Sequence, residues 1–229
     1  MNTIKMILAL VVGSVAVESS AGDITGQVTL KGKPRPERAV DLRSDSAIAA
    51  QYPKGMKTRH YEVGSDGGLQ HVLIYLQGDF TNTTFAASGT TTVLDHTNGL
   101  FQPYVVGVRV GEPLLFKCSD GTICSFHAML NAGADFSVTP GRDTVSRTFA
   151  QPELPVLFRC DLHPWNSAYV GVFSSPYFAV TDAQGRFTIR GVPAGRYSVA
   201  LFHPKTGTTA KPVVLADHPA TVDFEVFPR

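Results

Sequence analysis

Apolar and polar residues alternate in short runs along most of the chain, a pattern typical of β-strands with one buried face. The pattern predicts strands over residues 24–32, 69–78, 156–160 and 168–173, and two strands around a turn within 104–118. Clusters of Gly, Pro, Asp and Asn separate these runs, and the same pattern continues from residue 177 to the end. A short helix is expected over 45–51. Turns spaced about ten residues apart are typical of β-sandwiches, so the predicted fold class is all-β.

The composition fits a folded globular protein. The chain has 229 residues, of which 43% are hydrophobic and 17% charged. Its 20 Lys+Arg balance 19 Asp+Glu, giving a formal net charge of +1. Because nucleic-acid binders need a basic surface, this near-neutral balance argues against a nucleic-acid partner.

The N-terminus has the features of a secretory signal peptide over residues 1–21. Lys5 supplies a positive start, residues 6–17 form an apolar run, and Ser19-Ser20-Ala21 supplies small residues for cleavage. The run is short for a membrane span, although an uncleaved anchor is the alternative reading. We therefore expect a periplasmic or secreted protein whose mature chain begins near Gly22 and has no membrane span.

The C-terminal part resembles the carboxypeptidase-regulatory-like, or transthyretin-like, β-sandwich. The residues that carry this resemblance are Thr181, Asp182, Gly185, Phe187, Ile189, Pro193, Gly195, Tyr197 and Val199. Asp182 to Gly185 are expected to form a hairpin turn, with Phe187 and Ile189 on one strand face. Residues 176–229 are few for an independent core, and the start of the family's pattern lies at 26–42.

The two ends of the chain are therefore expected to pair into one sandwich. The predicted organisation is a signal peptide (1–21), N-terminal strands of the regulatory-like sandwich (22–79), an inserted second sandwich (80–175) and C-terminal strands (176–229). Two consecutive domains are the alternative.

The inserted segment resembles a cupredoxin, the Greek-key sandwich of blue-copper electron carriers. The resemblance lies in residues 105–130 and 147–173, and is most specific at Cys160-Asp161-Leu162-His163-Pro164-Trp165. The whole chain is also similar to exported bacterial proteins that join such a domain to regulatory-like strands, some of them described as methylamine utilisation proteins.

Ligand chemistry supports a metal interpretation of this motif. A Cys at the end of a strand and a His three residues later in a tight loop bring a thiolate and an imidazole to one point, a pair that suits copper. The family's first His position falls on Cys124, and its Met position falls on Asn166. His127 lies close by, but residues three apart on a strand face opposite ways unless a bulge intervenes. The resemblance implies one mononuclear copper site, with Cys160, His163, Cys124 and His127 as candidates.

Three cysteines leave the disulfide pairing open. Cys118 and Cys124 bracket a five-residue loop and fit a local bridge, whereas a bridge from Cys124 to Cys160 would consume the candidate thiolate. Either pairing leaves one thiol in a chain expected to be exported.

The remaining histidines carry no clear metal pattern. His96, His203 and His218 lie in or beside turn-like stretches and are expected to be solvated.

Sequence signatures of the common enzyme classes are missing: there is no HExxH, no GxSxG, no P-loop and no GxGxxG opening a helix. The expected function is copper binding or electron transfer with a redox partner protein, without catalysis. The alternative is a β-sandwich binding or scaffold module that has lost its metal.

Overall fold

The computed structural model describes residues 21–80, 83–121, 123–216 and 218–229. Almost all of its regular structure is β, which confirms the predicted fold class. The predicted signal peptide lies outside the described residues, apart from Ala21. Among the described residues, no helix has the length and apolar character needed to cross a membrane.

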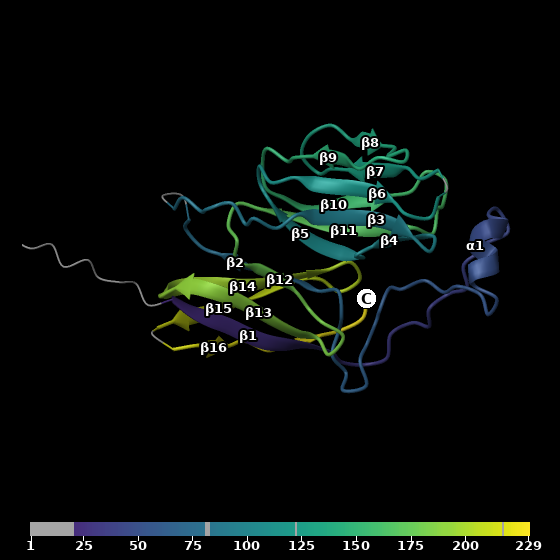
Figure 1. The fold of residues 1–229 in the computed structure, drawn as a ribbon. Helices are drawn as coiled ribbons and strands as arrows, with labels where there is room; N and C mark the ends of the chain where they lie inside the picture. Colours follow the sequence, from purple (N-terminus) through teal and green to yellow (C-terminus); the bar gives the residue numbers. More distant parts are fainter. Residues whose placement is uncertain (1–20, 81–82, 122, 217) are drawn as a thin grey trace, which may run out of the picture.

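The strands that come from the two ends of the chain build one sandwich (Figure 1). One of its sheets has the order β13, β1, β16, with β17 also paired to β1. The other has the order β12, β2, β14, β15. The bounds are β1 (Ala21–Leu30), β2 (Leu73–Gln77), β12 (Phe178–Val180), β13 (Arg186–Pro193), β14 (Gly195–His203), β15 (Gly207–Leu215), β16 (Ala220–Thr221) and β17 (Phe224–Val226).

The middle of the chain builds a second sandwich, drawn above the first in Figure 1. Its sheets have the orders β5, β11, β10, β7, β8 and β4, β3, β6, β9. Parallel pairing joins β11 to β5 and β3 to β6, whereas the other neighbours are antiparallel. The bounds are β3 (Thr92–Thr97), β4 (Leu100–Gln102), β5 (Val105–Arg109), β6 (Leu114–Cys118), β7 (Phe126–Met129), β8 (Phe136–Val138), β9 (Val145–Arg147), β10 (Glu153–Arg159) and β11 (Ser167–Phe173).

Each sandwich has its own apolar core, because inward-facing residues alternate along its strands. In the first, Ile24 of β1 is paired with Ile189 of β13, and both are buried. In the second, Phe116, Phe126 and Phe158 pack together. A smaller buried cluster includes residues of both sandwiches, Leu73 and Phe202 from the first and Tyr104 and Phe173 from the second. The two sandwiches therefore meet through apolar contacts.

The segment between β1 and β2 leaves the first sandwich and reaches one end of the second, where it carries α1 (Ser46–Gln51) (Figure 1). This confirms the short helix predicted over 45–51. Its N-cap is Asp45, whose Oδ1 accepts a hydrogen bond from the Ile48 amide at 2.9 Å. Ile48 is fully buried in a small cluster that packs against Leu100 and Trp165 of the second sandwich. This packing fixes Asp45 beside the loops of that sandwich.

Two sequence expectations need correction. The turn from Asp182 to Gly185 forms, with Gly185 at φ 71°, but it does not close a hairpin. The strands on either side, β12 and β13, pair in different sheets, so the turn carries the chain across the sandwich. The strands β3, β4, β8 and β9 were not predicted, because β4, β8 and β9 have only three residues each and four of the six residues of β3 are polar.

Candidate metal centre

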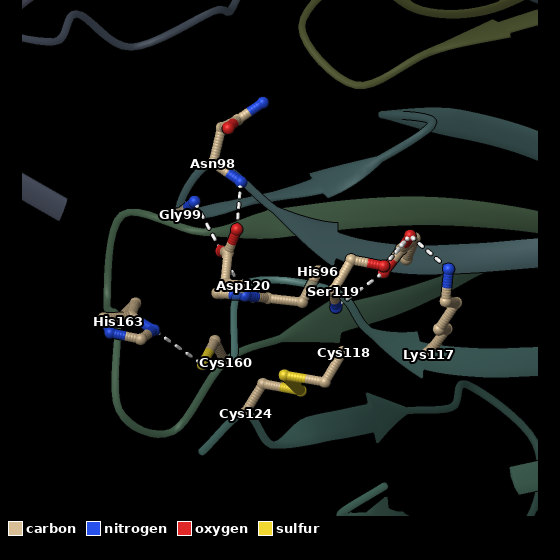
Figure 2. Close-up of a disulfide and its surroundings, with 11 residues drawn as sticks. His96, Asn98, Gly99, Lys117, Cys118, Ser119, Asp120, Cys124, Cys160 and His163 are labelled. Carbon is tan, nitrogen blue, oxygen red and sulfur yellow. Dashed lines mark hydrogen bonds and ion pairs between the residues drawn. A yellow bond between two sulfur atoms is a disulfide. The ribbon is translucent and has the colours of Figure 1, made fainter. Parts of the chain in front are cut away.

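The loop from Cys160 to Asn166 joins β10 to β11 and folds back on itself. The Cys160 amide donates to the carbonyl of Asn166 at 3.2 Å, and the Asn166 amide donates to the carbonyl of His163 at 2.8 Å. This closure turns the His163 ring toward the start of the loop, where its Nδ1 lies 3.4 Å from the Cys160 Sγ (Figure 2). The spacing in the sequence thus brings the thiol and the imidazole together as expected.

A second histidine completes a buried group of three donors. His96 of β3 lies beside this loop, and its ring stacks on that of His163 with centroids 5.2 Å apart. One ligand atom from each of His96, Cys160 and His163 lies within 4.8 Å of the others, and the three residues are 0%, 3% and 5% exposed. The expectation that His96 is solvated was therefore wrong, and the same expectation for His203, which is buried in the first sandwich, was also wrong.

The position of His96 follows from a hairpin between β3 and β4. Asn98 and Gly99 form a two-residue turn between β3 and β4, both with positive φ, and Asn-Gly is a strong signal for such a turn. Leu94 and His96 alternate inward on β3 and are both fully buried. An Asn-Gly turn after an alternating run was the signal that could have placed His96 in the core.

Each histidine has one ring nitrogen beside a carboxylate. Nε2 of His163 lies 3.0 Å from Oδ2 of Asp45, and Nδ1 of His96 lies 2.9 Å from Oδ2 of Asp120. Both ring nitrogens of His96 are buried and make no hydrogen bond of good geometry among the described residues, although Nδ1 lies close to the Asp120 carboxylate. Histidines that bind metals usually hold the other ring N–H on a carboxylate or carbonyl in this way, which fixes the tautomer and the ring orientation.

The two carboxylates are themselves held by backbone amides. The pKa of the Asp45 carboxyl is lowered, first by the N-cap hydrogen bond from the Ile48 amide and second by the contact with His163. Asp45 is therefore ionised. Asp120 accepts bonds from the amides of Asn98 and Gly99 at 2.5 and 2.8 Å (Figure 2). Burial lowers the pKa of His96, and this effect outweighs the nearby Asp120, which raises it. The lowered pKa favours a neutral ring with one unprotonated nitrogen.

A disulfide joins Cys118, the last residue of β6, to Cys124 (Figure 2). It closes the loop that contains Asp120, and so it limits the movement of the carboxylate beside His96. The sulfur of Cys124 is in this bond and is not a free thiolate, contrary to the expectation that it joins Cys160 and His163. Cys160 is the free cysteine of the described chain.

His127 lies apart from the three donors. It belongs to β7, and its Nδ1 lies 3.1 Å from Oδ1 of Asp161, which also accepts a 2.6 Å bond from the Ser125 hydroxyl. With 38% of its side chain exposed, His127 lines a surface cavity of about 300 Å³ together with Met129 and Cys160. The structure therefore replaces His127 with His96 in the group.

Asn166 stabilises the loop by hydrogen bonds. It occupies the position where the resemblance implies a Met ligand. Its Oδ1 accepts a 2.6 Å bond from the Phe101 amide, and its backbone closes the turn around His163. The side-chain oxygen is therefore engaged and not free for a metal.

This donor set fits a copper ion. Ligands at about 2.0–2.3 Å from an ion in a trigonal arrangement lie about 3.7 Å from one another, and Cys160 Sγ and His163 Nδ1 are 3.4 Å apart. One thiolate with two imidazoles is the trigonal set that copper accepts, whereas structural zinc almost always takes four ligands. The unpartnered Nε2 of His96 adds a buried nitrogen that a metal would satisfy.

No family model and no curated protein sequence matches the chain. Among solved structures, it is similar over 41% of its length to a copper-containing nitrite reductase (NirK) from Thermus scotoductus SA-01, with 16% identity and a TM-score of 0.34. The match spans 24% of that reductase chain. It is also similar to a Cu(I) form of one amicyanin mutant and to the oxidised state of another, with 16% and 17% identity. Both have a TM-score of 0.33 and cover 43% of this chain and 97% of theirs.

Proposed function

We propose that this chain is an exported protein that binds one copper ion through Cys160, His96 and His163 and transfers electrons to or from a redox partner protein. The buried group of one free thiol and two imidazoles, each imidazole with its other nitrogen on a carboxylate, carries this proposal. Export is inferred from the signal-like residues 1–21, and it is consistent with a disulfide elsewhere in the chain.

The surroundings of the group suit electron transfer better than catalysis. Copper supplies one-electron redox chemistry when bound. The protein's own residues exclude water, because all three donor residues are almost completely buried. The carboxylates of Asp45 and Asp120 lie 3.0 and 2.9 Å from the outer nitrogens of His163 and His96, which favours a proton on those nitrogens and helps to orient both rings. Ligands that the fold holds in place need to move little when the charge of the ion changes, which suits electron transfer.

Copper titration of the full chain with its disulfide intact tests this function. We expect one copper per chain and a thiolate-to-copper absorption band that disappears in Cys160→Ser. His96→Gln should weaken copper binding, because it removes a buried imidazole.

The matched control is His127→Gln. It makes the same substitution at the histidine that contacts Asp161 and lies outside the group of three donors. This variant should bind copper like the unmodified chain. Far-ultraviolet circular dichroism checks that each variant is folded. Sub-stoichiometric copper in the folded unmodified chain would instead favour a scaffold module without metal.

A further inference from the structure

A second group of donors surrounds the same histidine. One ligand atom from each of His96, Cys118 and Cys124 lies within 4.8 Å of the others. His96 is contributed by β3 and Cys118 by β6, the parallel neighbour that pairs it in register. Cys124 is fully buried just before β7. While the disulfide is intact, its sulfurs are not thiolates and this group has a single strong donor.

The disulfide can be reached from the surface. A cavity of about 530 Å³ is lined by Cys118, Ile123, Pro140 and Arg142, among others. Cys118 is partly exposed, whereas Cys124 is fully buried. A small dithiol that occupies this cavity would therefore meet the sulfur of Cys118 first.

We propose that the Cys118–Cys124 disulfide is a latent site for a thiophilic metal ion, opened by a dithiol reductant. A thiolate of the reductant attacks Cys118 Sγ, which forms a mixed disulfide and releases Cys124 as a thiolate. The second thiol of the reductant then attacks its own bound sulfur and releases Cys118. The reductant leaves as a disulfide, and two electrons and two protons have passed to the protein.

The reduced chain offers two thiolates and one imidazole, a set that favours Cu(I) or Zn²⁺. Binding releases the two thiol protons to solvent. This inference shares His96 with the proposed copper site, since His96 belongs to both groups. Reduction would therefore place the two groups in competition for one imidazole.

Zn²⁺ binding by Cys160→Ser tests the latent site separately, because this variant removes the only thiol of the first group. We expect the oxidised variant to bind no zinc tightly. After reduction with a dithiol, which is then removed without oxygen, it should bind one zinc per chain in competition with a chromophoric chelator. Adding Cys118→Ser to Cys160→Ser should abolish this binding.

Alkylation of the unmodified reduced chain provides a measurement that needs no variant. Zinc should protect Cys118 and Cys124 from iodoacetamide, as read by peptide mass spectrometry. Absence of zinc binding in reduced Cys160→Ser, or equal alkylation with and without zinc, would overturn the latent site. Failure of the oxidised unmodified chain to bind copper would overturn the proposed function instead, so the two failures are distinguishable.

Discussion

The carboxylate of Asp120 should control copper affinity without touching the metal. Its Oδ2 lies 2.9 Å from Nδ1 of His96, and its side chain is only 6% exposed, so solvent does not screen the pair. Asp120→Asn keeps a similar shape but removes the charge. Loss of such a partner typically costs 10–100-fold in metal affinity, which is about 1.4–2.7 kcal/mol.

The assay is a competition titration of the oxidised chain with a chelator of known copper affinity. The matched control is Asp161→Asn. It makes the same change in the carboxylate whose Oδ1 lies 3.1 Å from Nδ1 of His127, in a pair that is about half exposed. This control should leave copper affinity nearly unchanged. Equal affinities for Asp120→Asn and Asp161→Asn, with both variants folded, would refute the role given to Asp120 and His96.

Three further outcomes are expected. Desolvation lowers the pKa of His203 to about 4, so the unfolded chain takes up a proton below about pH 6.5 that the folded chain does not. Stability should therefore fall by up to about 3 kcal/mol between about pH 6.5 and 4, and His203→Asn should flatten this slope in urea titrations. Ile48→Ala removes the fully buried anchor of α1 and should cost about 2–4 kcal/mol locally, seen as faster proteolysis within residues 31–72. Gly68→Ala places a Cβ 1.9 Å from the Gln184 carbonyl oxygen and should lower the Tm by several degrees, whereas Gly141→Ala meets nothing within 4 Å and should not.

The sequence predicted the features that depend on local spacing. Alternation placed most of the longer strands, and the three-residue step from Cys160 to His163 predicted that the sulfur and the ring meet. Cys124 and His127 do lie apart, with Cys124 buried and His127 beside Asp161, although Cys124 precedes β7 and is not itself on a strand. The contact between Cys160 and His163 follows from their short separation and from the hydrogen bonds that close the loop between them.

The rest of the group depends on contacts between distant segments. Asp45 and His163 are 118 residues apart, and only the packing of α1 against the second sandwich brings them together. His96 lies on β3, which pairs with β6 as well as with β4, so its burial depends on a distant strand in addition to the local Asn-Gly turn. The choice of Cys118 over Cys160 as partner for Cys124 likewise rests on the tertiary structure.

X-ray absorption spectroscopy of the copper-loaded, oxidised chain tests the central claim most directly, because it counts the atoms bound to the metal. We expect one sulfur and two imidazole nitrogens, with the sulfur lost in Cys160→Ser and one nitrogen lost in His96→Gln. Copper bound only by oxygen and nitrogen, or a nitrogen count that falls in His127→Gln instead, would contradict the account.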